Sequence, residues 1–219
     1  MFAAASLKDT FTTLGEQFEA SHGGTKVTFN FAGSADLVAQ LQQGAPADVF
    51  ASADAKNMAK ATSDNLTDGS PVTFASNTLE IAVPPDNPAK IASFEDLTKA
   101  GVKVVVCAPE VPCGSATDKI EAATGITLQP VSEESAVTDV LNKVQTGEAD
   151  AGLVYLTDVR SAGGKVTGVP FPESSKAVNE YPIAPLTASK NKELAREFAE
   201  LVTGPKGQKV LADAGFAKP

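Results

Sequence analysis

Segments typical of strands and of helices alternate along almost the whole chain, and this alternation limits its fold more than any other feature. Strands are expected where β-prone apolar residues cluster: 26–31, 48–51, 79–83, 102–107, 151–155 and 166–169. Helices are expected where apolar residues recur with helical spacing: 8–22, 35–43, 93–99, 115–123, 135–146, 191–203 and 205–213. The alternation predicts an α/β protein whose mostly parallel sheets are flanked by helices.

Two extended segments, 73–83 and 178–186, are expected to cross between two lobes. Two crossings make the first lobe discontinuous, with residues 1–76 plus 185–219, and leave residues 77–184 for the second lobe. No internal repeat and no low-complexity linker interrupts either part.

Net charge and the lengths of the apolar runs argue against several classes of partner and against a membrane-spanning helix. The formal net charge of −9 disfavours nucleic acid and anionic membrane surfaces. No apolar run approaches the roughly 18 residues that a membrane-spanning helix needs. No signal segment is visible, and Met1 leads almost directly into the first turn, which indicates an engineered or processed start of a protein whose natural form could be exported.

Two serines each follow a β-prone segment and precede a helical pattern. Ser6 follows Phe2 to Ala5, and Ser34 follows a strand-like segment that ends in small residues. We predict that both are N-cap residues, so that hydroxyls and free N–H groups gather at the positive ends of helix dipoles. Two such ends directed at one point would form an uncharged site for an oxyanion. The structural alternative is that both serines only cap their helices.

Three further positions could add donors at the same edge, because ligands of open α/β sheets bind beyond the carboxyl ends of strands. The segment 110–115 follows one strand and contains Gly114, which allows close backbone approach. A helix that begins near Ser135 would offer the N–H of Val137, and Tyr155 ends a strand. The structural alternatives are a tight turn, an ordinary amphipathic helix and a buried tyrosine with a satisfied hydroxyl.

Enzyme signatures are sparse. His22 is the single histidine, and neither a G-x-S-x-G elbow nor a phosphate-binding glycine motif occurs. Cys107 and Cys113 could form a disulfide or remain thiols, and one histidine with two cysteines makes no strong zinc pattern. An enzyme that uses Cys113 as nucleophile is therefore kept as a rival hypothesis.

Several motifs strongly resemble the molybdate-binding proteins of bacterial ABC importers. The resemblance covers essentially the whole chain and is carried by FAAASL at 2–7, GAPADVFASAD at 44–54, PEVPCG at 109–114, GLVY at 152–155, EYP at 180–182 and GF at 215–216. It implies a two-lobed type II periplasmic-binding fold, each lobe a mostly parallel sheet flanked by helices, with the ligand in the cleft between the lobes. It also implies closure by hinge motion.

The resemblance implies a binding protein rather than an enzyme, with no cofactor and with molybdate or tungstate as the ligand. The family's ligand positions fall on the hydroxyls of Ser6, Ser34 and Tyr155 and on the backbone N–H groups of Cys113 and Val137. No residue is implied as a direct ligand of a metal cation. The implied protein is a monomer that delivers the anion to a membrane permease, outside the cytoplasm, either in the periplasm or anchored by lipid at the cell envelope.

Two departures and one alternative accompany the resemblance. The family usually has alanine at the position of Cys113, and its members have several residues before the first motif. Sulfate, phosphate or another small anion is the alternative ligand, and phosphate would be favoured by a carboxylate such as Asp36 or Glu134 close to the site. Rejection of sulfate, which has the same charge and is smaller, would have to depend on the size of the site.

Overall fold

The computed structural model describes residues 1–219 and divides the chain into two compact units. The first unit contains residues 1–76 and 180–219, and the second contains residues 77–179. The sequence placed the second boundary between the lobes at residue 185, which is the end of the strand Asn179–Pro185. The two compact units instead divide between residues 179 and 180, at the start of that strand.

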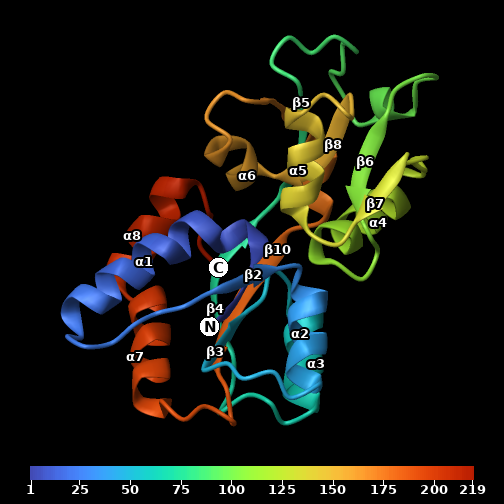
Figure 1. Cartoon of the computed structure of the whole chain (residues 1–219). Coiled ribbons are helices and arrows are strands. Elements are labelled where there is room, and N and C mark those ends of the chain that lie inside the picture. The colour runs from blue at the N-terminus through green and yellow to red at the C-terminus, as the bar shows by residue number, and fades with distance from the viewer. The chain divides into compact units, whose positions relative to one another are not determined.

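Each unit contains a five-stranded sheet (Figure 1). The strands are β1 Phe2–Ala4, β2 Asn30–Ala32, β3 Val49–Ala51, β4 Val72–Asn77, β5 Leu79–Val83, β6 Val104–Cys107, β7 Ser132–Glu134, β8 Ala151–Tyr155, β9 Thr167–Val169 and β10 Asn179–Pro185. The α-helices are α1 Lys8–Ser21, α2 Ser34–Gln42, α3 Ala55–Ser63, α4 Pro112–Thr124, α5 Val137–Gln145, α6 Leu156–Ser161, α7 Lys192–Thr203 and α8 Pro205–Ala214. Short 3₁₀ helices are η1 Ala5–Leu7, η2 Glu95–Thr98 and η3 Pro172–Lys176. None of the helices is both long and apolar enough to cross a membrane.

The sheet of the first unit has the order β2-β1-β3-β10-β4. β1 pairs in parallel with β2 and β3, and β10 returns from the second unit to pair antiparallel with β3. Helices α1, α7 and α8 cover one face and helices α2 and α3 cover the other (Figure 1). The first face buries a cluster around Phe11, Phe18 and Phe198, and the second buries Leu37 and Met58.

The sheet of the second unit repeats this plan in the order β7-β6-β8-β5-β9. β6 pairs in parallel with β7 and β8, whereas β5 pairs antiparallel with β8 and β9. Both sheets are therefore mixed, with a parallel group of three strands extended by antiparallel ones. Parallel strands need long connections, and here helices follow each strand of the parallel groups.

Some elements differ from the sequence-based expectation. Strand β7 and helix α6 were not predicted, because β7 is a polar edge strand and α6 is a single short segment without helical periodicity. The helix expected at 93–99 is only the 3₁₀ turn η2. The strand expected at 26–31 is Asn30–Ala32, because its partner β1 begins only at Phe2, which pairs with Asn30.

Candidate functional site

Ser6 lies inside the short turn that joins β1 to α1. The N-cap position of this turn is Ala4, and no side chain caps it, so the prediction that Ser6 is an N-cap residue was wrong. β1 ends at Ala4, which places Ser6 within the helical turn instead of before it. Its Oγ lies 3.1 Å from the hydroxyl of Tyr181, a fully buried residue of β10.

Ser34 is the first residue of α2, and the N-cap prediction was wrong here too, because Gly33 occupies the cap position. The Ser34 side chain is 1% exposed, and its Oγ accepts a hydrogen bond of 3.0 Å from the N–H of Ala53. An oxygen that accepts from a backbone N–H keeps its own proton for another acceptor. Ser34 is therefore oriented to act as a donor.

The segment that contacts Ser34 is held by Asp54. As predicted, Asp54 caps the next helix, α3, and its carboxylate accepts hydrogen bonds from the N–H and the Nδ2 of Asn57 at 2.7 and 3.1 Å. Ser52 Oγ donates to the Asp54 carbonyl oxygen at 2.8 Å. Burial raises the pKa of the Asp54 carboxyl, although the hydrogen bonds from Asn57 and Ser52 act in the opposite direction.

The turn before α4 is tighter than expected. Helix α4 begins at Pro112, three residues before the predicted start at 115, so Cys113 lies in its first turn. A Cβ atom at Gly114 would lie 2.0 Å from the carbonyl oxygen of Ala108, so this position requires glycine. The first N–H groups of a helix have no partner within the helix, and Cys113 supplies one of them.

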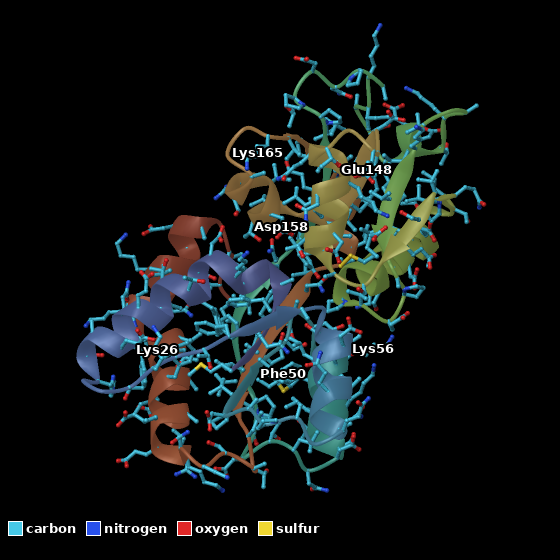
Figure 2. The ribbon with its side chains drawn as sticks, in the orientation of Figure 1. Lys26, Phe50, Lys56, Glu148, Asp158 and Lys165 are labelled. Atoms are coloured by element: carbon cyan, nitrogen blue, oxygen red, sulfur yellow. A yellow bond between two sulfur atoms is a disulfide. The ribbon has the colours of Figure 1, made fainter.

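Cys107 and Cys113 form a disulfide that links the end of β6 to the first turn of α4, with a Cα–Cα distance of 5.6 Å. Sulfur atoms among the side-chain sticks are yellow in Figure 2. The sequence did not decide between a disulfide and two free thiols. The structure contains no free cysteine. A nucleophilic role for Cys113, the rival hypothesis, requires a free thiolate. In the disulfide state Cys113 has no thiol to ionise.

Val137 is the first residue of α5 and is buried, so its N–H belongs to the free first turn of that helix. The preceding β7 ends at Glu134, whose carboxylate pairs with Lys143 and accepts from Ser132 Oγ at 2.7 Å. Burial by itself would raise the pKa of Glu134, but the hydrogen bonds from Lys143 and Ser132 leave it lowered. Glu134 is therefore an ionised and already paired carboxylate.

Tyr155 ends β8, as predicted, and is 1% exposed. Its hydroxyl accepts from Asn179 Nδ2 at 3.0 Å and from the backbone N–H of Asp158. Sequence reasoning missed Asn179, because nothing in the segment 178–186 distinguishes it from an ordinary polar residue of an extended crossing.

Within each unit, the predicted residues gather at the carboxyl ends of adjacent parallel strands. Ser6 follows β1 and Ser34 follows β2, and the register places Ala4 opposite Ala32. Cys113 follows β6, Val137 follows β7 and Tyr155 ends β8, and these three strands are neighbours in the sheet. Each unit thus brings hydrogen-bond donors to one edge of its sheet, as the strand order of an α/β sheet predicts.

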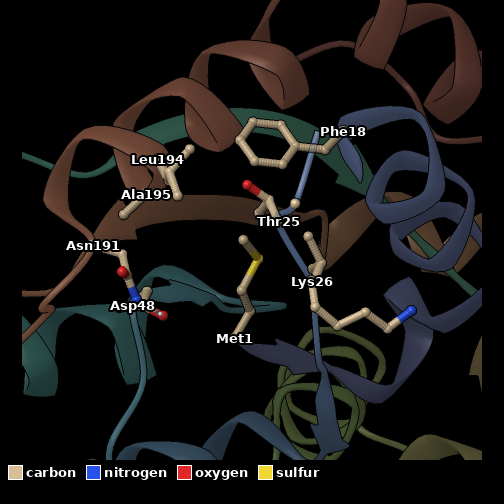
Figure 3. Close-up of a pocket in the computed structure, with 10 residues that line it drawn as sticks. Met1, Phe18, Thr25, Lys26, Asp48, Asn191, Leu194 and Ala195 are labelled. Atoms are coloured by element: carbon tan, nitrogen blue, oxygen red, sulfur yellow. Dashed lines mark hydrogen bonds between the residues drawn. The ribbon is translucent and has the colours of Figure 1, made fainter. Parts of the chain in front are cut away.

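Two hollows of the first unit lie away from the proposed donors. A cavity of about 260 Å³ is lined by Met1, Phe18, Asp48, Asn191 and Leu194, among others (Figure 3). A second, apolar hollow lies beside α3 and includes Met58, Pro71 and Pro182. None of the predicted donors lines either of them. No cluster of three or more histidine, cysteine or acidic side chains could hold a metal cation.

Comparisons with known proteins place the chain in a family. Residues 1–217 match the family described as bacterial extracellular solute-binding proteins. The chain belongs to this family. Its members are binding proteins of transporters rather than enzymes.

A relative from Mycobacterium tuberculosis, the molybdate-binding protein ModA, is 56% identical over 219 residues, which are all of this chain and 84% of the relative. The periplasmic molybdate-binding protein of Azotobacter vinelandii superposes with a TM-score of 0.87 at 23% identity, covering 100% of this chain and 98% of that one. The sulfate-binding protein SubI of M. tuberculosis superposes with a TM-score of 0.85 at 20% identity, covering 99% and 85%. The fold is thus shared by proteins named for different oxyanions.

Proposed function

We propose that this protein captures molybdate or tungstate outside the cytoplasm and delivers it to the permease of an ABC importer. The observation that carries the proposal is the 56% identity, over the whole chain, to a relative named as a molybdate-binding protein. The likeness in fold alone is neutral, because a sulfate-binding protein superposes almost equally well.

The proposed ligands are the hydroxyls of Ser6, Ser34 and Tyr155 and the N–H groups of Cys113 and Val137. All five groups are neutral donors, which suits a dianion that carries no proton at neutral pH. Free N–H groups at the starts of α4 and α5 add the positive ends of two helix dipoles. Neutral dipoles bind an anion without a buried cation, which favours later release.

A site made only of donors disfavours phosphate, which retains a proton at neutral pH and gains from an acceptor. The two carboxylates that the sequence analysis named do not offer one readily. Glu134 is paired with Lys143, and Asp36 is exposed on α2. Sulfate remains the second candidate, because the structure of a sulfate-binding protein shares the fold. We infer a preference for the larger anions from the name of the relative that is 56% identical.

The remaining parts of the proposal concern partners and location. We infer that the protein acts as a monomer and that its partner is a membrane permease. We further infer a periplasmic location, or a cell-envelope location with a lipid anchor on the natural precursor. The closeness of the relatives does not distinguish tungstate from molybdate, so both remain in the proposal.

Titration calorimetry of ligand-stripped protein with molybdate, tungstate, sulfate and phosphate tests the function. We expect one-to-one binding of molybdate and tungstate, and affinities for sulfate and phosphate at least about 100-fold weaker, equal to about 2.7 kcal/mol. Equal binding of sulfate would replace the proposed ligand with the second candidate. Absence of binding for all four anions would contradict an oxyanion function.

Ser34→Ala tests the site. Removal of the hydroxyl deletes one proposed donor, and we expect molybdate affinity to fall by roughly 10- to 100-fold, the usual effect of a hydrogen bond to a charged group. Ser189→Ala is the matched control, because Ser189 is also buried and its Oγ also accepts from a backbone N–H, that of Asn191 at 3.0 Å. Equal affinities of the two variants would contradict the assignment of Ser34.

A further inference from the structure

We propose that Asn179 is a positioning residue for anion capture, and that its side-chain amide orients two of the proposed donors, the hydroxyl of Tyr155 and the N–H of Cys113. This inference rests on the proposed function. Asn179 is the first residue of β10 and is 6% exposed. It belongs to the second unit, as do both groups that it contacts.

The amide nitrogen of Asn179 contacts two oxygen atoms. Nδ2 lies 3.0 Å from the hydroxyl oxygen of Tyr155 and 3.4 Å from the carbonyl oxygen of Pro112. An amide nitrogen carries two hydrogens and can only donate. One side chain therefore connects the end of β8 to the first turn of α4, the two elements that carry the proposed donors.

The contact determines how the Tyr155 hydroxyl can be used. Its oxygen accepts from Asn179 Nδ2 and also from the N–H of Asp158. With its oxygen accepting from two obligate donors, the hydroxyl can use its own proton only to donate. Asn179 thus directs the Tyr155 proton away from itself and toward another acceptor, as a fully deprotonated anion requires.

The second contact orients a backbone donor. The bond between Pro112 and Cys113 is trans, since the structure contains no cis peptide, and a trans peptide directs its C=O and N–H to opposite sides. A hydrogen bond that holds the Pro112 carbonyl therefore also holds the direction of the Cys113 N–H. The Cys107–Cys113 disulfide restrains the same turn through the side chain.

A corresponding contact occurs within the first unit. Tyr181 lies two residues after Asn179 on β10, and its hydroxyl is 3.1 Å from Ser6 Oγ. When Ser6 donates its proton to a ligand, Tyr181 must be the donor in this pair. In each unit, therefore, a buried residue of β10 contacts a proposed ligand hydroxyl.

Asn77 offers a matched control for substitutions at Asn179. It is 4% exposed, belongs to the same unit, and donates through Nδ2 to the hydroxyl of Thr157 at 2.8 Å. Thr157 is not a proposed ligand. Substitutions at Asn77 and Asn179 should therefore have similar effects on folding but different effects on binding.

The first experiment compares Asn179→Leu with Asn77→Leu by titration with molybdate. Leucine is similar in size and cannot donate, so we expect Asn179→Leu to weaken binding by at least about 10-fold, the effect of one lost hydrogen bond or more. Asn77→Leu should stay within about threefold of wild type. Circular dichroism and thermal unfolding establish that both variants are folded.

The second experiment measures the pH dependence of Asn179→Asp. An ionised aspartate would accept the Tyr155 proton and remove it from the ligand, whereas a protonated one can donate again. Burial raises the pKa of a carboxyl, so the variant should bind molybdate several-fold more tightly at pH 6 than at pH 8. Wild type and Asn77→Asp should not show this gain, and a purely structural role for Asn179 would not produce it.

The outcomes separate this inference from the proposed function. If wild type does not bind molybdate, or Tyr155→Phe binds as tightly as wild type, the proposed function or its site is overturned and this inference with it. If wild type binds and Tyr155→Phe is weakened, equal affinities of Asn179→Leu and Asn77→Leu overturn the positioning role alone. A selective loss in Asn179→Leu, with a pH-dependent recovery in Asn179→Asp, supports it.

Discussion

At the scale of single residues, the main feature is that the proposed ligand hydroxyls are held by partners that donate to them. Ser34 accepts from Ala53 and Tyr155 accepts from Asn179, at 3.0 Å in both cases. A preoriented donor needs less reorganisation when it binds a charge. The residues proposed to contact the anion are thus only part of the proposed binding machinery, and their buried neighbours orient the hydroxyl protons.

Asp54→Asn is expected to change how stability depends on pH. Burial raises the pKa of Asp54, so the native state retains a proton that the unfolded chain loses above about pH 4. Stability contributed by this group is therefore greatest at low pH and decreases as pH rises through the raised pKa. An asparagine can still accept from the N–H of Asn57 but does not ionise.

Urea unfolding at several values between pH 4 and pH 7 measures this effect. As pH rises from 4 to 7, wild type loses the stability that Asp54 contributes, whereas Asp54→Asn has no such loss. The free energy of unfolding of the variant should therefore become more favourable relative to that of wild type as pH rises. An identical change in both proteins would mean that Asp54 does not titrate differently in the native and unfolded states.

At the scale of elements, the decisive feature is the connection that follows each parallel strand. The turns after β1, β2, β6 and β7 each lead directly into a helix, and β8 ends in Tyr155 at the N-cap of α6. The connection between β6 and α4 is the most restrained, with a disulfide and a glycine that no larger residue can replace without movement. Rigid connections of this kind hold N–H groups in place for a ligand.

Gly114→Ala tests this restraint. In an ordinary helix the change from glycine to alanine stabilises by about 1 kcal/mol. At Gly114 the new Cβ would lie 2.0 Å from the Ala108 carbonyl oxygen, so we expect destabilisation by about 1–3 kcal/mol and weaker molybdate binding. Chemical denaturation and calorimetry measure the two effects.

Gly23→Ala is the control, because nothing lies within 4 Å of a Cβ at that position. It should change neither stability nor affinity by more than a small amount. Stabilisation by Gly114→Ala would show that the turn can move away from α4 at little cost.

At the scale of the whole molecule, the chain forms two units and crosses between them twice. The first unit is assembled from both ends of the chain, and the second is continuous from Asn77 to Asn179. Each unit has its own sheet and its own donors. If one anion binds both sets of donors, binding must stabilise the folded molecule as a whole.

Thermal unfolding in the presence of molybdate measures this stabilisation. At a free concentration 1,000 times the dissociation constant, a ligand of the native state adds about 4 kcal/mol. For a chain of this length that corresponds to a rise in Tm of roughly 8–16 °C. Sulfate at the same concentration should produce a much smaller rise in Tm. A Tm that does not change when molybdate is added would contradict the prediction.

Much of the candidate site was predictable because its parts are local. The helix at 8–22 and the strands at 79–83 and 151–155 follow from apolar periodicity, and Asp54 follows from its position before a helix. The positions of Ser6 and Ser34 relative to their caps were mispredicted, because a shift of one or two residues at a helix start leaves no trace in the periodicity.

The sequence by itself determined most of the alternation of strands and helices, the family resemblance and the positions where donors emerge, because these depend on residues close together in the chain. Only the tertiary structure decided the partners of those donors. Ser6 and Tyr181 are 175 residues apart and Tyr155 and Asn179 are 24 apart. The polar strand β7 likewise exists because β6 pairs with it. Contacts of this kind follow from how the elements pack, and no local pattern of residues encodes them.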